Sequence, residues 1–246
     1  AGVQFAIAGQ RGIFDAGEMK QALWPASPHV PKCVLVCLEN THNHSGGRIF
    51  PQPDVLAISA SAKERSLRLH LDGARLWHAS AASGIEPETL AAPFDSVSVC
   101  FSKGLGAPVG SAIVGDSGLI EEAWRFRKML GGGMRQAGIL AAGALFALRE
   151  QRHDLLKDHE KAQTVARVLQ DGGLEVIEPE TNIVMIRFRA PAQALVDACG
   201  KQGVLFFAMA ENLVRLVMHR DVSLAEVTRA AHLVLRCQRE LTPAKP

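Results

Sequence analysis

An acid and an amine occupy comparable places in this sequence, each close behind a short apolar run. Asp72 follows residues 67–71, and Lys103, 31 positions further on, follows residues 97–101. A lysine amine can form a Schiff base with an aldehyde, and a carboxylate favours the protonated form of a nearby ring nitrogen. Taken singly, Asp72 is more typical of a turn or a helix N-cap, and Lys103 of an exposed loop charge.

The two residues together suggest a cofactor. Pyridoxal phosphate requires a lysine that forms the Schiff base and a carboxylate that pairs with the pyridine nitrogen. Lys103 lies in a loop, residues 101–108, with two glycines and a proline. Such a loop can bring backbone close to a ligand and hold one side chain in place. The spacing of the acid and the amine is a weak indication by itself.

Two histidines, His42 and His44, form an H-x-H pair in a polar loop after the apolar run at residues 34–38. A zinc site is one interpretation of this pair, but the pattern shows no third ligand. A single histidine that transfers a proton is favoured, because the histidine pKa is near neutrality. We therefore expect one of the two histidines to act in proton transfer over the cofactor, and we expect no bound metal.

Short apolar runs that alternate with helical stretches predict an α/β fold with a mostly parallel sheet. In the first part of the chain, strands are predicted at residues 34–38, 67–71, 97–101 and 111–114, with helices at 54–65 and 119–128. One or two long helices are predicted over residues 137–169. The remainder predicts an α+β unit, with strands at 183–188, 204–207 and 214–218 and helices at 193–202 and 224–240. We place a domain boundary near residue 152, between a large domain (1–152) and a small one (153–246).

Composition limits the class of protein. The chain has 246 residues, 48% hydrophobic and 21% charged, which is typical of a globular protein. Its formal charge of +2 and the lack of a basic run argue against nucleic acid or a membrane surface as a partner. Neither an apolar run of membrane-spanning length nor a signal peptide is recognised, so a soluble, cytoplasmic protein is expected. Five scattered cysteines do not suggest a disulfide framework, and Cys33 and Cys37 are interpreted as core residues.

Four segments in succession resemble one family. They are ENTHNHSGG, LHLDGARLWHA, VCFSKGLGAPVGS and RKMLGGGMRQAGILAA. Their order and spacing are similar to those of the threonine aldolases, which are pyridoxal phosphate-dependent enzymes of fold type I. The resemblance implies a fold type I large domain with a smaller C-terminal α+β domain. It also implies cleavage of L-threonine or L-allo-threonine to glycine and acetaldehyde, in threonine breakdown and glycine formation, by a homodimer or homotetramer.

The resemblance assigns roles to single residues. Lys103 corresponds to the Schiff-base lysine, Asp72 to the partner of the pyridine nitrogen, and His42 to the active-site histidine near the substrate β-hydroxyl. Arg75 would approach the ring hydroxyl or the substrate.

Three further residues follow from the same resemblance. Lys128 and Arg135 resemble residues donated to the site of a neighbouring subunit, where Arg135 would reach the cofactor phosphate. Arg215 resembles the arginine of the C-terminal domain that binds the substrate α-carboxylate, for which a planar, bidentate donor is well suited.

The sequence departs from the family pattern at its start. A Ser-Gly-Thr-type turn that binds the cofactor phosphate and a histidine that stacks on the pyridine ring do not occur before His42, so we expect an N-terminal segment to be missing. Two alternatives stay open. One is a catalytically inactive subunit or interaction partner, and the other is a different fold type I enzyme, such as an aminotransferase or a β-eliminating lyase.

Overall fold

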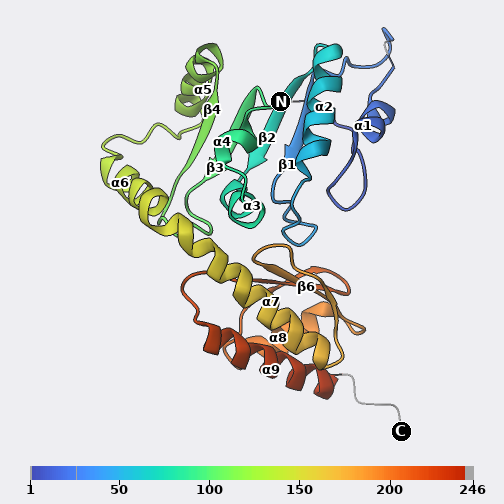
Figure 1. The fold of residues 1–246 in the computed structure, drawn as a ribbon, viewed down its shortest axis with the longest axis vertical. Helices are drawn as coiled ribbons and strands as arrows, with labels where there is room; N and C mark the ends of the chain where they lie inside the picture. Colours follow the sequence, from blue (N-terminus) through green and yellow to red (C-terminus); the bar gives the residue numbers. More distant parts are fainter. Residues whose placement is uncertain (1, 26, 242–246) are drawn as a thin grey trace. The chain divides into compact units, whose positions relative to one another are not determined.

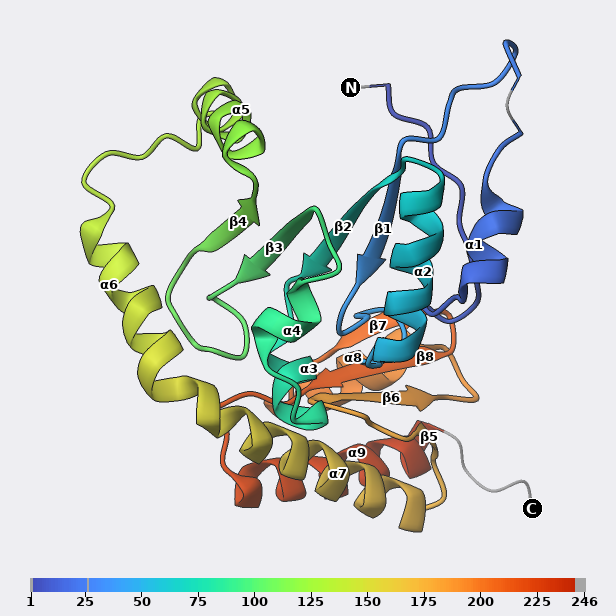
Figure 2. The ribbon, with the colours of Figure 1, turned by 45° about the horizontal axis from the view of Figure 1, so that its top comes forward.

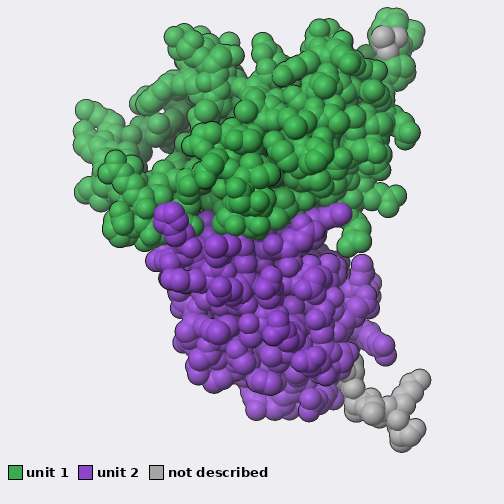
Figure 3. Space-filling model, viewed as in Figure 1, with its two compact units in different colours: residues 1–42, 49–152 green, residues 43–48, 153–246 purple. Residues whose placement is uncertain are grey.

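The computed structural model describes residues 2–25 and 27–241, which form two compact units. Residues 1–42 and 49–152 belong to the first unit, and residues 43–48 and 153–246 belong to the second (Figure 3). In the described ranges, no helix combines the length and the apolar character needed to cross a membrane.

The first unit is built on a four-stranded sheet (Figure 1). Its strands are β1 (Leu35–Glu39), β2 (Arg68–Gly73), β3 (Ser96–Cys100) and β4 (Ser111–Gly115), in that spatial order. β1, β2 and β3 run parallel, whereas β4 pairs antiparallel with β3. The loop between β3 and β4 is only ten residues long, too short for the usual helical crossover between parallel strands. The predicted mostly parallel sheet is confirmed.

Helices cover one face of this sheet. The helices of the unit are α1 (Ala16–Ala22), α2 (Gln52–Glu64), α3 (Leu76–Ser83), α4 (Pro87–Ala91), α5 (Ser117–Met129) and α6 (Gly138–Phe146). Because side chains alternate along a strand, Leu38 of β1 and Leu71 of β2 point to the same face. There they pack in one core with Ile58 of α2 and Leu76 of α3. Phe14 and Phe50 close this core with an edge-to-face contact, their centroids 5.5 Å apart.

The other face of the sheet is less covered. Cys37 lies between the buried residues Val36 and Leu38 on β1, so its side chain points to the opposite side, where it is exposed. The prediction of Cys37 as a core residue is therefore wrong, because strand alternation directs it away from the helices. Cys33 is half-buried and packs against the margin of the core.

Beyond β4, α5 and α6 are the last helices of the unit (Figure 2). α5 begins at an N-cap in which the Asp116 side chain accepts a hydrogen bond from Leu119 N–H (2.8 Å). Neither α5 nor α6 contains a buried residue. Even large apolar side chains are exposed there, with Trp124 of α5 at 61% and Ile139 of α6 at 86%. The predicted helical stretch 137–169 is two α-helices, because a π-helix (Ala147–Gln151) and a 3-10 turn (Arg152–Asp154) follow α6.

The second unit is an α+β unit on an antiparallel sheet. Its elements are α7 (Leu155–Asp171), β5 (Glu175–Ile177), β6 (Ile183–Arg187), α8 (Ala192–Gly200), β7 (Phe207–Ala210), β8 (Leu213–Val217) and α9 (Leu224–Leu241), with the sheet order β5-β6-β8-β7. Val165 of α7, Leu195 of α8 and Val234 of α9 pack with Val184 and Val214 of the sheet in one buried core. Each of these side chains is at most 1% exposed, as expected for the apolar stripes of three helices against one sheet face.

Some predicted elements need correction. The strand predicted at residues 204–207 lies instead at 207–210, because Phe207 pairs with Arg215 and Ala208 with Val214 across a tight β7–β8 hairpin. Four short elements were not predicted: α1, α3, α4 and β5. The other predicted strands and helices lie within a few residues of their expected positions.

Candidate active site

Three polar side chains come from neighbouring parallel strands at their carboxyl ends. His42 follows β1, Asp72 lies near the end of β2, and Lys103 follows β3. Glu39 of β1 pairs in register with Asp72, and the Asn40 N–H donates to the Asp72 carbonyl at 3.0 Å. All three side chains therefore originate at one edge of the sheet, which is where open α/β sheets bind their ligands.

The Asp72 carboxylate is exposed on the sheet face that the helices leave uncovered. Its Oδ1 accepts a hydrogen bond from the Ala74 N–H at 3.0 Å, the local turn contact expected for an aspartate followed by glycine. Oδ2 has no hydrogen-bond partner among the described residues. Cys37, on the neighbouring strand, is exposed as a residue, but partial burial of its sulfur, with a smaller effect from the Asp72 charge, raises the pKa of the thiol.

Gly73 allows β2 and β3 to approach at this point. A Cβ atom there would lie 2.8 Å from the Ser98 carbonyl oxygen, so a side chain would push the two strands apart. Trp77, at the start of α3, donates from Nε1 to the Cys100 carbonyl at 3.1 Å. This bond fixes the helix that follows Asp72 to the strand that precedes Lys103.

Lys103 lies in a loop that is held by its own backbone. The Gly106 N–H donates to the Lys103 carbonyl at 2.8 Å, and the Ala107 N–H donates to the Phe101 carbonyl at 3.0 Å. Leu105 is 1% exposed and anchors the loop in the protein interior. The Lys103 side chain is exposed, and its Nζ has no partner among the described residues. The loop thus presents a free amine beside the strand that ends next to Asp72.

His42 is held from two sides. Its Nε2 lies 3.6 Å from Glu39 Oε2, at the end of the same strand. Gly12, with φ +76°, packs directly on the ring, since a Cβ atom there would overlap His42 Nδ1. The imidazole side chain remains 22% exposed, so one part of it is accessible at the strand edge.

The other three predicted residues of this unit belong to α3, to α5 and to the loop after α5. Arg75 occupies the N-cap position of α3 and is half-buried. Lys128 near the end of α5 and Arg135 in the following loop are both exposed, and no contact joins either of them to Asp72 or Lys103 in the described part of the chain. The structure therefore brings His42, Asp72 and Lys103 to one edge and leaves Lys128 and Arg135 outside it.

Arg215 belongs to the second unit. It lies on β8 and is half-buried, and its Nη1 donates to Asn43 Oδ1 at 2.6 Å. Its Nε is buried and has no hydrogen-bond partner among the described residues. β8 lies between β6 and β7 in its sheet, so Arg215 is not on an edge strand.

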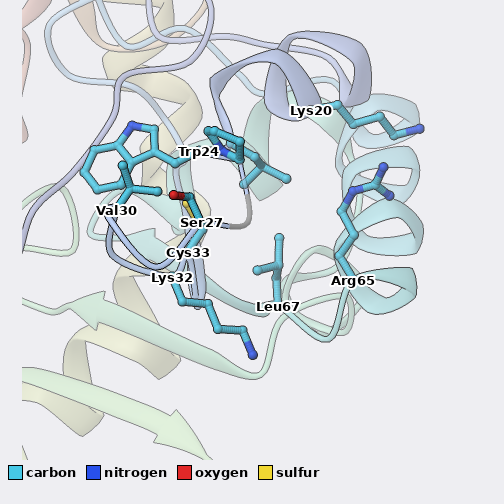
Figure 4. A pocket seen from close by; sticks show the side chains of 10 residues that line it. Lys20, Trp24, Ser27, Val30, Lys32, Cys33, Arg65 and Leu67 are labelled. Atoms are coloured by element: carbon cyan, nitrogen blue, oxygen red, sulfur yellow. The ribbon is translucent and has the colours of Figure 1, made fainter.

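Two cavities lie elsewhere in the first unit. A groove of about 930 Å³ runs between β3–β4 and α5–α6, and apolar side chains such as Phe101 and Trp124 line most of it. A second pocket, of about 580 Å³, lies near the amino ends of β1 and β2 (Figure 4). Lys20, Lys32 and Arg65 line this pocket without a carboxylate among its lining residues, and it is at the opposite edge from Asp72.

The described side chains form no group of three histidine, cysteine or acidic residues that could hold a metal ion. His42 and His44 therefore have no third ligand within the described ranges.

The residues that support the site were not predicted. Gly12 and Trp77 stand far from their partners in the sequence, and the only signals were a glycine in a turn and an indole after the Asp-Gly pair.

Several known proteins have sequences similar to this chain. The profile of the beta-eliminating lyase family matches residues 1–191. The low-specificity L-threonine aldolase 1 of Arabidopsis thaliana is 41% identical over 89% of this chain and 63% of its own length. The low specificity L-threonine aldolase of Escherichia coli K12 is 40% identical over 90% of this chain and 66% of its own length.

A solved structure shows that the fold is shared as well. The threonine aldolase of Leishmania major superposes with a TM-score of 0.75 at 19% identity, over 92% of this chain and 67% of that one. This likeness confirms the fold type I architecture. The chain spans about 54% to 66% of the length of the curated relatives that it matches first.

Proposed function

Because the chain belongs to the beta-eliminating lyase family, we propose that it is part of a pyridoxal phosphate-dependent threonine aldolase. The substrates are L-threonine and L-allo-threonine, and the products are glycine and acetaldehyde. The observation that carries the proposal is the exposed Asp72 carboxylate and the partner-free Lys103 amine at the ends of two adjacent parallel strands. Relatives about 40% identical that are named threonine aldolases support the choice of substrate.

The side chains at this edge fit the cofactor. Asp72 has one carboxylate oxygen without a hydrogen-bond partner in the described part of the chain, and the same holds for Lys103 Nζ. Lys103 would bind the cofactor covalently, and Asp72 would hold a proton on the pyridine nitrogen. Arg75 would approach the ring hydroxyl or the substrate. When bound, the cofactor supplies an electron-withdrawing ring that stabilises negative charge on the substrate α-carbon.

The remaining residues act on the amino acid itself. His42 takes the proton from the substrate β-hydroxyl, directly or through a water, which is the proton transfer that breaking the Cα–Cβ bond requires. Arg215 binds the α-carboxylate and so fixes which bond of the α-carbon is presented for cleavage. The large domain, residues 1–152 without the segment 43–48 that packs in the other unit, binds the cofactor, and residues 153–246 form the small domain.

The complete protein acts as a homodimer or homotetramer. The support is the apolar surface of α5 and α6, where Trp124, Phe126 and Ile139 are all more than half exposed. In that assembly, Lys128 and Arg135 serve the neighbouring subunit, and Arg135 contacts the cofactor phosphate. We also assign the protein to the cytoplasm, which is consistent with its five free cysteines. Its reaction belongs to threonine breakdown that yields glycine.

One titration tests the proposal most directly. Purified chain is titrated with pyridoxal phosphate while visible absorption is followed, and it is then incubated with L-threonine. Covalent uptake of the cofactor and release of glycine and acetaldehyde in equal amounts are expected. A chain that takes up no cofactor would instead be an inactive subunit or interaction partner.

A second candidate function is β-elimination, which the name of the matching family favours. The same acid and amine would serve either reaction, so product analysis has to separate them. An aldolase releases glycine and acetaldehyde from threonine without a keto-acid acceptor. A β-eliminating lyase releases ammonia and a keto acid, and an aminotransferase turns over only when an acceptor is added.

A further inference from the structure

We propose that Asn43 is a positioning residue, which holds the Arg215 guanidinium in the orientation that binds the α-carboxylate of the substrate. Both residues belong to the second unit. The inference rests on the carboxylate-binding role proposed above for Arg215. It adds a residue to that role and explains how the guanidinium is oriented before an amino acid arrives.

The strand directs Arg215 away from the core of its unit. Val214 and Leu216, its neighbours on β8, are buried among the helices, so alternation places Arg215 on the opposite face of the sheet. Across the sheet it pairs with Met185 of β6 on one side and with Phe207 of β7 on the other. The long arginine side chain thus leaves an apolar surface on which only its head group can make polar contacts.

The hydrogen bond to Asn43 occupies one part of that head group. Nη1 donates to Asn43 Oδ1 at 2.6 Å, a short bond of the kind that a charged donor makes. An asparagine oxygen accepts this bond without neutralising the guanidinium, whereas a carboxylate at the same place would. The positive charge of Arg215 therefore stays available to an anionic ligand.

The bond to Asn43 also decides which edge of the guanidinium remains available to a ligand. Arg215 Nε is buried and has no hydrogen-bond partner among the described residues, and Nη2 likewise lacks one. A buried donor without an acceptor is unfavourable, and native proteins seldom keep one. Nε and Nη2 lie on the same edge, the fork that a carboxylate can bind with both oxygens. With Nη1 held by Asn43, this fork is the part of Arg215 left for a ligand.

Asn43 is itself held to the sheet by the segment that carries it. The Gly46 N–H donates to the Asn43 carbonyl at 3.1 Å, and Thr181 Oγ1, fully buried, donates to the Gly47 carbonyl at 2.7 Å. Gly46 has φ +86°, and a Cβ atom there would lie 2.8 Å from Met185 Cγ. The glycines allow residues 43–48 to lie directly on β6, so Asn43 and Arg215 are fixed to the same sheet.

The experiment observes Arg215 itself. The chain is labelled with [15N]arginine, and the Nε–H signal of Arg215 is identified by its loss in Arg215→Lys. L-Threonine is then titrated in, and 1-amino-2-propanol, which lacks the carboxylate, is the matched ligand. Threonine is expected to shift the Arg215 signal and the amine is not. Asn43→Ala is expected to raise the half-saturating threonine concentration about tenfold, since one hydrogen bond to a charged group is lost. His44→Ala, at the exposed neighbouring position, should leave that concentration unchanged.

Each outcome decides the inference. An unchanged half-saturating concentration in Asn43→Ala, an equal response to both ligands, or no response to threonine would overturn it. These readouts do not depend on turnover or on bound cofactor. A chain that shows the expected shifts but releases no glycine and acetaldehyde would therefore contradict the aldolase proposal and leave the role of Asn43 supported.

Discussion

The sheets of the two units differ in how far their faces and strand ends are covered by the rest of the unit. In the second unit, α7, α8 and α9 cover one face of the sheet, and residues 43–48 lie on the other. In the first unit, the core described above buries one face of the sheet against helices, and the strand ends present Asp72 and Lys103 exposed and incompletely paired. The second sheet is a region where packing supplies stability. The carboxyl edge of the first is a region where side chains are kept ready for a ligand, so changes in the two regions should have separable effects.

The largest effect is expected at that edge. Lys103→Ala removes the amine that binds the cofactor, so threonine cleavage should fall by about a thousandfold or more. The visible absorption of the covalently bound cofactor should disappear with it. Because the Lys103 side chain is exposed, the midpoint of thermal unfolding of the cofactor-free chain should not change. Retained absorption and turnover in this variant would remove Lys103 from its proposed role.

The opposite pattern is expected in the core of the second unit. Leu195 is fully buried, and Leu195→Ala should lower the free energy of unfolding by about 2–5 kcal/mol, because a cavity replaces apolar contacts. Ile139→Ala on α6 is the matched control, since Ile139 is 86% exposed and should change stability by about 0.5 kcal/mol or less. Urea unfolding followed by circular dichroism measures both. Equal losses in the two variants would mean that Ile139 is covered, either within this chain or by a second copy of it.

A selective loss of rate is expected for His42. His42→Ala should slow threonine cleavage about 100-fold or more, the usual contribution of a general base. Cofactor binding, measured by absorption, should be preserved, because Asp72 and Lys103 are unchanged. His44→Ala is the control for a histidine in the same loop. An unchanged rate in His42→Ala would show that another group takes the proton.

The smallest effect is expected at the amino edge of the first sheet, where a polar group is already paired. Burial opposes ionisation of Asp95, but hydrogen bonds from the Leu69 N–H (2.7 Å) and Arg68 Nη1 (2.9 Å) outweigh it and lower the pKa of Asp95. A carboxyl whose pKa is lowered by folding stabilises the fold above its unfolded pKa and loses this contribution as pH falls through its folded pKa. Asp95→Asn should therefore cost about 1 kcal/mol or less at neutral pH, since the ion pair is largely exposed.

The test for Asp95 compares urea unfolding of the variant and the original chain at neutral pH and in acid. The difference in unfolding free energy should disappear below the folded pKa of Asp95. Threonine cleavage at neutral pH should be unaffected. A difference that grows in acid would have the wrong sign for a lowered pKa.

Much of the first sheet could be predicted from sequence because each strand is a short apolar run. The runs at 67–71 and 97–101 lie within two residues of β2 and β3, and their ends locate Asp72 and Lys103. The sequence did not predict which face of each strand is buried. Cys37 sits in an apolar run, but nothing local in the sequence tells which face of the strand the helices cover.

Contacts between distant residues could not be predicted either. Gly12 packs on His42, and Trp77 bonds to the Cys100 carbonyl, but neither pair has a local pattern that would signal it. The strand predicted at 204–207 was misplaced for a related reason, since pairing across the β7–β8 hairpin, rather than the apolar run, decides where β7 begins.

Residues 43–48 belong to the second unit although 104 residues separate them from the rest of it, which starts at residue 153. A piece cut to residues 153–246 would consequently lose the strip that shields Ile183 and Met185 on the outer side of β6. Such a piece would expose apolar surface and be prone to aggregate. Expressed separately, it would lack these contacts, and a peptide carrying residues 43–48 would restore them.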